Sequence, residues 1–229
     1  MAIPLTAIAT FLAATFFALS VRAQDLPGGP SRGPIPPVTR QILAALDAAV
    51  PALTRDVLLV SSRAACPPAP KVISQGDQKT IGGYFSKYYI DVDELEVLVS
   101  GRVTIGPKII GYVIDAPGKY DLSVVDLWTY DVANNRWQKP MELSENWGDA
   151  GEYYYSDSLL VDVDGDGYKD IVKRGKHGML DMGPKRPERV FFDKTVVRKI
   201  IGGAFRDAGA PPKFLKDRLL ALEKKLDCE

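Results

Sequence analysis

Apolar residues early in the chain recur at steps of three and four, which is the spacing of one helix face. The series consists of Ile42, Leu46, Ala49 and Leu53. Thr39 precedes the series and is a residue type that caps helix N-termini. Pro51 lacks the amide hydrogen that a helix interior needs, so it limits or kinks the helix. We therefore expect a helix that begins at Thr39 and ends near Pro51.

The centre of the chain changes to the two-residue period of β-strands. Apolar, β-branched and aromatic stretches are separated by turn pairs such as Gly-Pro and Pro-Gly, which is typical of an antiparallel meander. The expected strands are Glu94–Ile105, Lys108–Asp115, Tyr120–Tyr130, Tyr153–Val163, Ile171–Lys173 and Arg189–Ile201. Asn134 and Asn135 predict a hairpin turn before Trp137, because asparagine adopts a positive φ at low cost.

Helical spacing returns at the end of the chain, where leucines follow Pro211-Pro212 every three or four residues. This seam predicts a C-terminal helix over residues 212–226. The whole pattern predicts an α+β fold: a mostly antiparallel sheet, meander or blade-like, with N-terminal and C-terminal helices packed on it. We expect one globular domain over residues 38–229, with its β-rich part at 80–201.

The N-terminal segment has the pattern of a secretory signal peptide. Residues 2–21 carry no charge, and small residues precede a possible cleavage site after Ala23. We expect residues 1–23 to be removed and the protein to be periplasmic or secreted, without membrane attachment. A retained anchor is the alternative, because about 20 apolar residues can span a bilayer. Residues 24–37 are rich in proline and glycine and predict a linker.

Cysteine and histidine are scarce, with two Cys and one His in 229 residues. Zinc fingers, Cys-rich iron–sulfur sites and dense disulfide frameworks are therefore excluded. Cys66 and Cys228 are expected to form a disulfide in an oxidising compartment, with two free thiols as the alternative. We expect His177 to lie in an exposed loop and not to act as a general base.

Charge is balanced overall but unevenly distributed. Residues 86–170 hold 7 basic and 17 acidic residues, whereas residues 173–229 hold 15 basic and 8 acidic ones. The acidic middle suits a cation, and the basic end suits an anionic partner or the acidic middle itself. No nucleic-acid-binding module accompanies the basic residues, so nucleic acid is not an expected partner.

The acidic middle contains a short loop in which carboxylates alternate with other residues. Asp162, Asp164, Asp166 and Asp170 occupy loop positions 1, 3, 5 and 9, and a glycine stands at position 6. Ca²⁺ takes six to eight oxygen ligands, and alternating residues of a sharply turned loop supply them. The backbone carbonyl of Tyr168 would add a ligand from position 7. We therefore expect calcium at Asp162, Asp164, Asp166, Tyr168 and Asp170, with an ordinary Asp-Gly turn as the alternative.

Residues 159–172, with the sequence LLVDVDGDGYKDIV, resemble the aspartate-rich calcium loops of the EF-hand, dockerin and FG-GAP/VCBS groups. The FG-GAP/VCBS form is the most similar, because the flanks read as strands and Lys173 stands where an EF-hand has its glutamate. The resemblance implies a single calcium loop that joins two strands.

These observations favour an exported, calcium-binding, β-rich protein without catalytic activity, whose partner is an unidentified protein or glycan. Thirteen of its aromatic residues lie between Tyr84 and Tyr155, either in the sheet core or exposed for stacking on a ligand. The alternative is a carboxylate-dependent hydrolase with a structural calcium, which requires two carboxylates of perturbed pKa in a cleft. A third hypothesis is an exported inhibitor or binding protein that contacts its partner through the basic segment Lys185–Lys225.

Overall fold

A computed structural model describes residues 34–60, 71–85, 97–117, 123–149, 151–180, 188–201 and 204–218, all within one compact unit. The elements are α1 (Pro37–Ala49), β1 (Val57–Val60), β2 (Lys71–Val72), α2 (Gln75–Phe85), β3 (Leu98–Gly106), β4 (Ile109–Pro117), β5 (Ser123–Asp131), β6 (Arg136–Trp137), β7 (Met141–Asp149), β8 (Glu152–Val161), β9 (Asp170–Leu180), β10 (Glu188–Ile201) and β11 (Ala204–Asp207). Residues 213–218 are also helical. The signal peptide, most of the linker, Cys66, Cys228 and residues 219–226 of the expected C-terminal helix lie outside the described residues.

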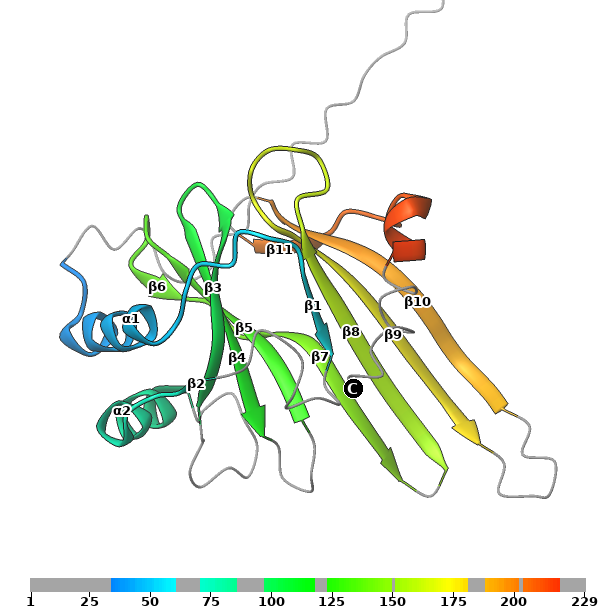
Figure 1. Ribbon diagram of the computed structural model, residues 1–229, viewed down its shortest axis with the longest axis horizontal. Coiled ribbons are helices and arrows are strands. Elements are labelled where there is room, and N and C mark those ends of the chain that lie inside the picture. The colour runs from blue at the N-terminus through cyan, green and yellow to red at the C-terminus, as the bar shows by residue number, and fades with distance from the viewer. Residues whose placement is uncertain are drawn as a thin grey trace, which may run out of the picture. The chain divides into compact units, whose positions relative to one another are not determined.

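Antiparallel strands dominate the fold, as the two-residue period predicts. Nine strands follow the order β11-β10-β9-β8-β7-β5-β4-β3-β2 (Figure 1), while β1 pairs with β8 and β6 pairs with β5. The predicted hairpin turn forms between β5 and β6, where Asn135 has a φ of 49°. Asp131 stabilises this turn because its carboxylate accepts the amide hydrogens of Ala133 and Asn134 at 3.0 and 3.1 Å.

The first helix begins two residues earlier than the sequence predicts. Pro37 stands at its first turn, where the ring pre-sets a helical φ and no amide hydrogen is needed. Thr39, the expected N-cap, instead lies buried inside the helix. The helix ends at Ala49, before Pro51.

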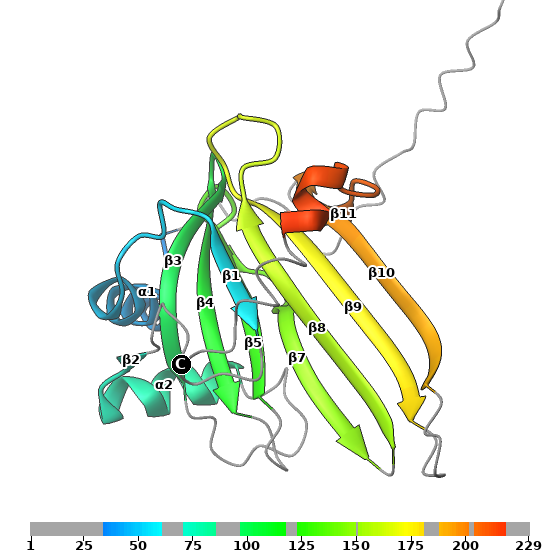
Figure 2. The same cartoon turned by 45° about the vertical axis from the view of Figure 1, so that its right-hand side comes forward.

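Helices α1 and α2 lie on the same side of β3, β4 and β5 in both views (Figure 2). Ile42 and Leu46 of α1 and Phe85 of α2 are buried against Tyr112 and Trp128 of the sheet. The Phe85 ring stacks on the Trp128 ring with centroids 3.7 Å apart. This core fixes the helical layer on β3–β5 because it buries the helices' apolar faces.

Two further apolar clusters lie along the sheet. The larger one joins β1, β3, β4, β5, β7, β8 and β9 and consists of Leu59, Val103, Ile105, Val113, Val125, Leu127, Met141, Leu143, Leu160 and Ile171. The smaller one consists of Leu159, Val161, Val172, Val197 and Leu215. Leu159 and Leu160 are consecutive on β8 and belong to different clusters, so both faces of this strand are covered.

Strand β8 changes partner halfway along its length. Its first half pairs with β7 up to Ser156, and its second half pairs with β1 from Asp157 onward. Buried serines bridge the point where β7 leaves. The Ser144 hydroxyl donates to the carbonyl of Ser156 at 2.7 Å, and the Ser158 hydroxyl donates to the carbonyl of Leu143. These hydroxyls satisfy backbone groups that the interrupted ladder leaves without strand partners.

A β-bulge on β7 changes which side chains share a face. Val125 of β5 is opposite Ser144, but the next residue, Asp126, is opposite Glu142. Leu143 is therefore an extra residue in β7. In a regular strand, Glu142 and Glu145 would point to opposite faces. The extra residue instead brings both side chains to one face.

Candidate functional site

The aspartate-rich loop connects β8 to β9, as the sequence predicts for residues between two strands. Gly165 and Gly167 have φ values of +79° and +86°, a region that other residues enter only with strain. The Lys169 amide hydrogen donates to the carbonyl of Thr104 at 3.0 Å. This bond ties the loop to β3.

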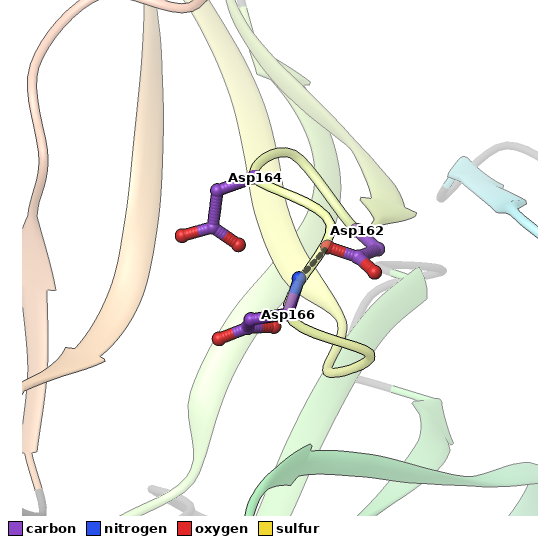
Figure 3. A group of neighbouring side chains, drawn as sticks. All are labelled: Asp162, Asp164 and Asp166. Carbon is purple, nitrogen blue, oxygen red and sulfur yellow. Dashed lines mark hydrogen bonds between the residues drawn. The ribbon is translucent and has the colours of Figure 1, made fainter.

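Asp162 organises the bend through its hydrogen bonds to the backbone. Its Oδ1 accepts the amide hydrogens of Gly165 and Asp166 at 2.7 and 3.2 Å, and its Oδ2 accepts that of Gly167 at 2.9 Å. Figure 3 shows the three aspartates around this bend, with the bond from Asp166 to Asp162 dashed. The carboxylate at position 1 therefore shapes the loop and still has lone pairs for a ligand.

The carboxylates of Asp162, Asp164 and Asp166 converge, with one oxygen from each within 4.8 Å of the others. Two oxygens that bind one Ca²⁺ at 2.3–2.6 Å lie at most about 5 Å apart. All three can therefore reach a single ion. The donor set consists of hard carboxylate oxygens, which fits calcium.

Asp170 and Tyr168 contribute differently from these three. Asp170 is buried, and its Oδ2 accepts the amide hydrogen of Val163 at 3.1 Å. Tyr168 donates its amide hydrogen to Asp166 Oδ1 at 2.9 Å, which leaves its carbonyl as the predicted ligand. The structure brings Asp162, Asp164 and Asp166 together and places Asp170 at the base of the loop.

Lys199 of β10 is a cation that the spacing of the loop does not reveal. Its Nζ lies 2.6 Å from Asp164 Oδ2 and 3.2 Å from Asp170 Oδ2. The hydrogen bond from Lys199 lowers the pKa of Asp164, whereas burial raises the pKa of Asp170 despite the same cation. Burial opposes the charge on Lys199, but its bonds to the two carboxylates outweigh burial and raise its pKa. Lys199 therefore neutralises part of the loop's charge.

A second polar cluster lies on the bulged face of β7. Glu142 Oε1 accepts hydrogen bonds from the hydroxyls of Tyr154 and Ser156 at 3.1 and 2.6 Å, and it pairs with the Lys173 ammonium. The Glu142 carbonyl also accepts from Lys173 Nζ at 3.0 Å. Glu145 hydrogen-bonds to the Glu142 side chain. One carboxylate therefore receives donors from β7, β8 and β9.

The two glutamates have opposite protonation tendencies. Burial, together with the neighbouring Glu142 charge, raises the pKa of Glu145 to about 7. Burial also opposes the charge on Glu142, but Lys173 outweighs it and lowers the pKa of Glu142. Glu145 therefore keeps its proton to a higher pH than Glu142 does, and its protonated form donates a hydrogen bond to ionised Glu142.

Next to this pair is a pocket of about 320 Å³. It is lined by Glu142, Tyr154, Lys173, Gly175, Phe192, Lys194, Val196, Arg198 and Asp207. A row of rings extends from it: the Trp147 ring stacks on Tyr154 at 6.0 Å, and Tyr154 lies 6.1 Å from Phe192. Phe191 and Phe192 are 55% and 43% exposed, so part of the aromatic side chains is available on the surface.

His177 lies in this aromatic row and not in an exposed loop. It belongs to β9, is partly buried, and its Nε2 lies 2.7 Å from Glu152 Oε1. The strand pairing explains its place, because Tyr154 is directly opposite His177 across the β8–β9 ladder. Sequence spacing could not identify it, since β9 extends well past the expected Lys173.

Comparisons with protein-family models, curated proteins and solved structures give no match to this chain. Among the described residues, the helices are too short or too polar to cross a membrane.

Proposed function

We propose that this chain is an exported, non-catalytic, calcium-binding β-rich protein. Its calcium ion would stabilise the loop that connects β8 to β9. The observation that carries the proposal is the convergence of three carboxylate oxygens within 4.8 Å at Asp162, Asp164 and Asp166. The Tyr168 carbonyl, Asp170 and water would complete a shell of six to eight oxygens. The resemblance of residues 159–172 to FG-GAP/VCBS loops supports the same ion.

Electrostatics supports a divalent ion at this bend. The three converging carboxylates repel one another, and Lys199 pairs with Asp164 and Asp170. Among the described residues, no cation forms an ion pair with Asp162 or Asp166. A divalent cation between the three oxygens removes this repulsion and fixes the bend.

Calcium titration of the purified chain tests the proposal. Ligand at 100 times its Kd stabilises a protein by about 2.7 kcal/mol, which corresponds to a rise of roughly 5–10 °C in Tm for a chain of this size. The double variant Asp164→Asn/Asp166→Asn should lose this shift. Asp217→Asn is the matched control, because Asp217 is an exposed aspartate outside the loop. An identical Tm with calcium and with chelator would contradict the proposal.

The partner of this protein would be a protein or a glycan that meets the aromatic face of β7–β10. Exposed aromatic side chains are common anchors in recognition surfaces, and Phe191 and Phe192 are exposed here. In this proposal calcium stabilises the β8–β9 connection, and the partner binds the face formed by the same strands.

A carboxylate-dependent hydrolase is the second candidate, and Glu142 and Glu145 beside the pocket favour it. Their direct hydrogen bond argues against glycoside hydrolysis, which separates its carboxyl groups by about 5 Å or more. Peptide or ester hydrolysis by a proton-sharing pair remains the form to test. Hydrolysis that Glu145→Gln abolishes without a change in Tm would favour this candidate over the non-catalytic one.

A further inference from the structure

The floor of the pocket beside Glu142 is a glycine in the middle of β9. A Cβ at Gly175 would lie 3.2 Å from Phe192 Cε2 and 3.8 Å from the Tyr154 hydroxyl. Glycine inside a strand often marks a place where a ligand or another backbone comes close. A side chain at this position would crowd the Phe192 ring, whose centroid lies 6.1 Å from that of Tyr154, so glycine lets the two rings come close to each other beside the pocket.

The charges of the pocket leave one cation without an ion pair. Lys173 pairs with Glu142, and Arg198 Nε lies 3.0 Å from Asp207 Oδ1. Lys194 also lines the pocket, and it has no ion pair with any residue that the structure describes. Three cations face two carboxylates, so the pocket carries one net positive charge. It therefore complements a ligand with a single negative charge.

The walls are mixed and not simply apolar. Tyr154, Phe192 and Val196 present apolar surface, while five of the nine lining residues carry charge. A fatty acid would lay its alkyl chain along the Lys173–Glu142 and Arg198–Asp207 pairs and take them out of water without offering hydrogen bonds, at a cost in affinity. A phosphate dianion would meet only one unpaired cation. A polyhydroxylated ring with one carboxylate satisfies the polar groups and also covers the rings with its C–H face.

We propose that this pocket binds an acidic monosaccharide unit, a uronate, with its carboxylate on Lys194 and one face of its ring against the Tyr154 and Phe192 side chains that line the pocket. This rests on the proposed binding function and names the glycan class. In this proposal the sugar hydroxyls donate hydrogen bonds to the Glu142 carboxylate, which lines the pocket. The pocket volume of about 320 Å³ suits one or two sugar rings, at the lower end of small-molecule sites.

Isothermal titration calorimetry with glucuronate, glucose and acetate tests this proposal on the full chain. Glucuronate should bind more tightly than either of the others, because only it combines the ring and the charge. Lys194→Met should weaken glucuronate binding by about tenfold, the expected loss for a hydrogen bond to a charged group. Lys79→Met is the matched control, because Lys79 is exposed on α2 outside the pocket lining.

A second variant tests the floor of the pocket independently of charge. Gly175→Ala should reduce glucuronate affinity while leaving the Tm close to that of the wild type, since the Phe192 ring can shift by a few tenths of an ångström. Equal affinities for glucuronate and acetate, or for glucuronate and glucose, would overturn the proposal. Absence of glucuronate binding would also overturn it. A calcium-dependent Tm in the same preparations would show that the calcium proposal survives that result.

Discussion

Replacing Lys199 by methionine changes the competition between two cations for the loop. The lysine Nζ lies 2.6 Å from Asp164 Oδ2 and 3.2 Å from Asp170 Oδ2. A calcium ion bound to Asp164 would share this carboxylate with the ammonium. We therefore expect opposite effects of Lys199→Met on the metal-free protein and on calcium binding.

The size of the effect on calcium follows from distance. An ion about 2.4 Å from Asp164 Oδ2 would lie at most about 5 Å from the Lys199 ammonium, because Nζ is 2.6 Å from the same oxygen. In the dielectric of water, the repulsion between a divalent calcium ion and a singly charged ammonium at this distance is about 1–2 kcal/mol. Lys199→Met should therefore tighten calcium binding by roughly 5- to 30-fold. A lysine side chain can swing away from the ion, which makes the lower end of this range the expected one.

The metal-free protein should become less stable in the same variant. The Asp170 side chain is 11% exposed and would lose the hydrogen bond from its cation. Loss of a hydrogen bond to a buried charged group costs about 1–3 kcal/mol, or a fall of several degrees in Tm. Calcium calorimetry and thermal unfolding in chelator measure the two effects separately, with Lys79→Met as control.

Either of two results would refute this reasoning. Weaker calcium binding in Lys199→Met would mean that Lys199 positions Asp164 for the ion and does not compete with it. Unchanged affinity at low ionic strength would mean that Lys199 does not oppose the ion, because a repulsion at about 5 Å is poorly screened there.

Three further predictions concern the sheet, the loop and the core. Because the pKa of Glu145 rises from 4.5 to about 7 on folding, its protonated form stabilises the protein below about pH 4.5 and this contribution is lost as the pH rises through 7. In pH-dependent unfolding, Glu145→Gln should remove that decline; an unchanged decline would argue against the shift. Gly167→Ala should lower the free energy of unfolding, measured by chemical denaturation, by about 1–2 kcal/mol, because Gly167 has a positive φ and open space around it. The control Gly83→Ala in α2 should leave the free energy of unfolding unchanged or raise it. Trp128→Ala should lower the free energy of unfolding in the same assay by about 3–5 kcal/mol, since Trp128 is fully buried. A loss under 1 kcal/mol would contradict the packing described.

The alternating strands and the acidic loop were predictable because local pattern determines them. Asn135 adopts the positive φ expected of a turn residue, and the loop lies between two strands as its flanks predict. The grouping of Asp162, Asp164 and Asp166 follows from their spacing on one bend. These features need no knowledge of distant residues.

Helix α2 and strand β7 could not be predicted, because distant contacts stabilise them. Helix α2 contains three glycines, which disfavour helices. Its stability comes from burial of Ile81 and Phe85 and from the Gln78 side chain, which hydrogen-bonds to both backbone groups of Val97 at 2.7 Å. In β7 the bulge interrupts the alternation that identifies strands.

The second polar cluster was hidden for the same reason. Glu142 and Glu145 are three residues apart, a spacing that places side chains on opposite faces of a regular strand. Lys173, which stood out in the sequence only as a departure from the EF-hand pattern, is the cation of that cluster. Partners that come together from separate strands are defined by register, and register depends on the whole sheet.

The pairing of β1 with β8 has a consequence for how the chain matures. Val57 lies opposite Leu160, so about a hundred residues must be synthesised after β1 before its partner exists. Until then the strand exposes unpaired amide and carbonyl groups, the kind of edge that promotes misassembly. Such high contact order slows folding. A chain that remains extended until its β8 segment has emerged avoids this hazard.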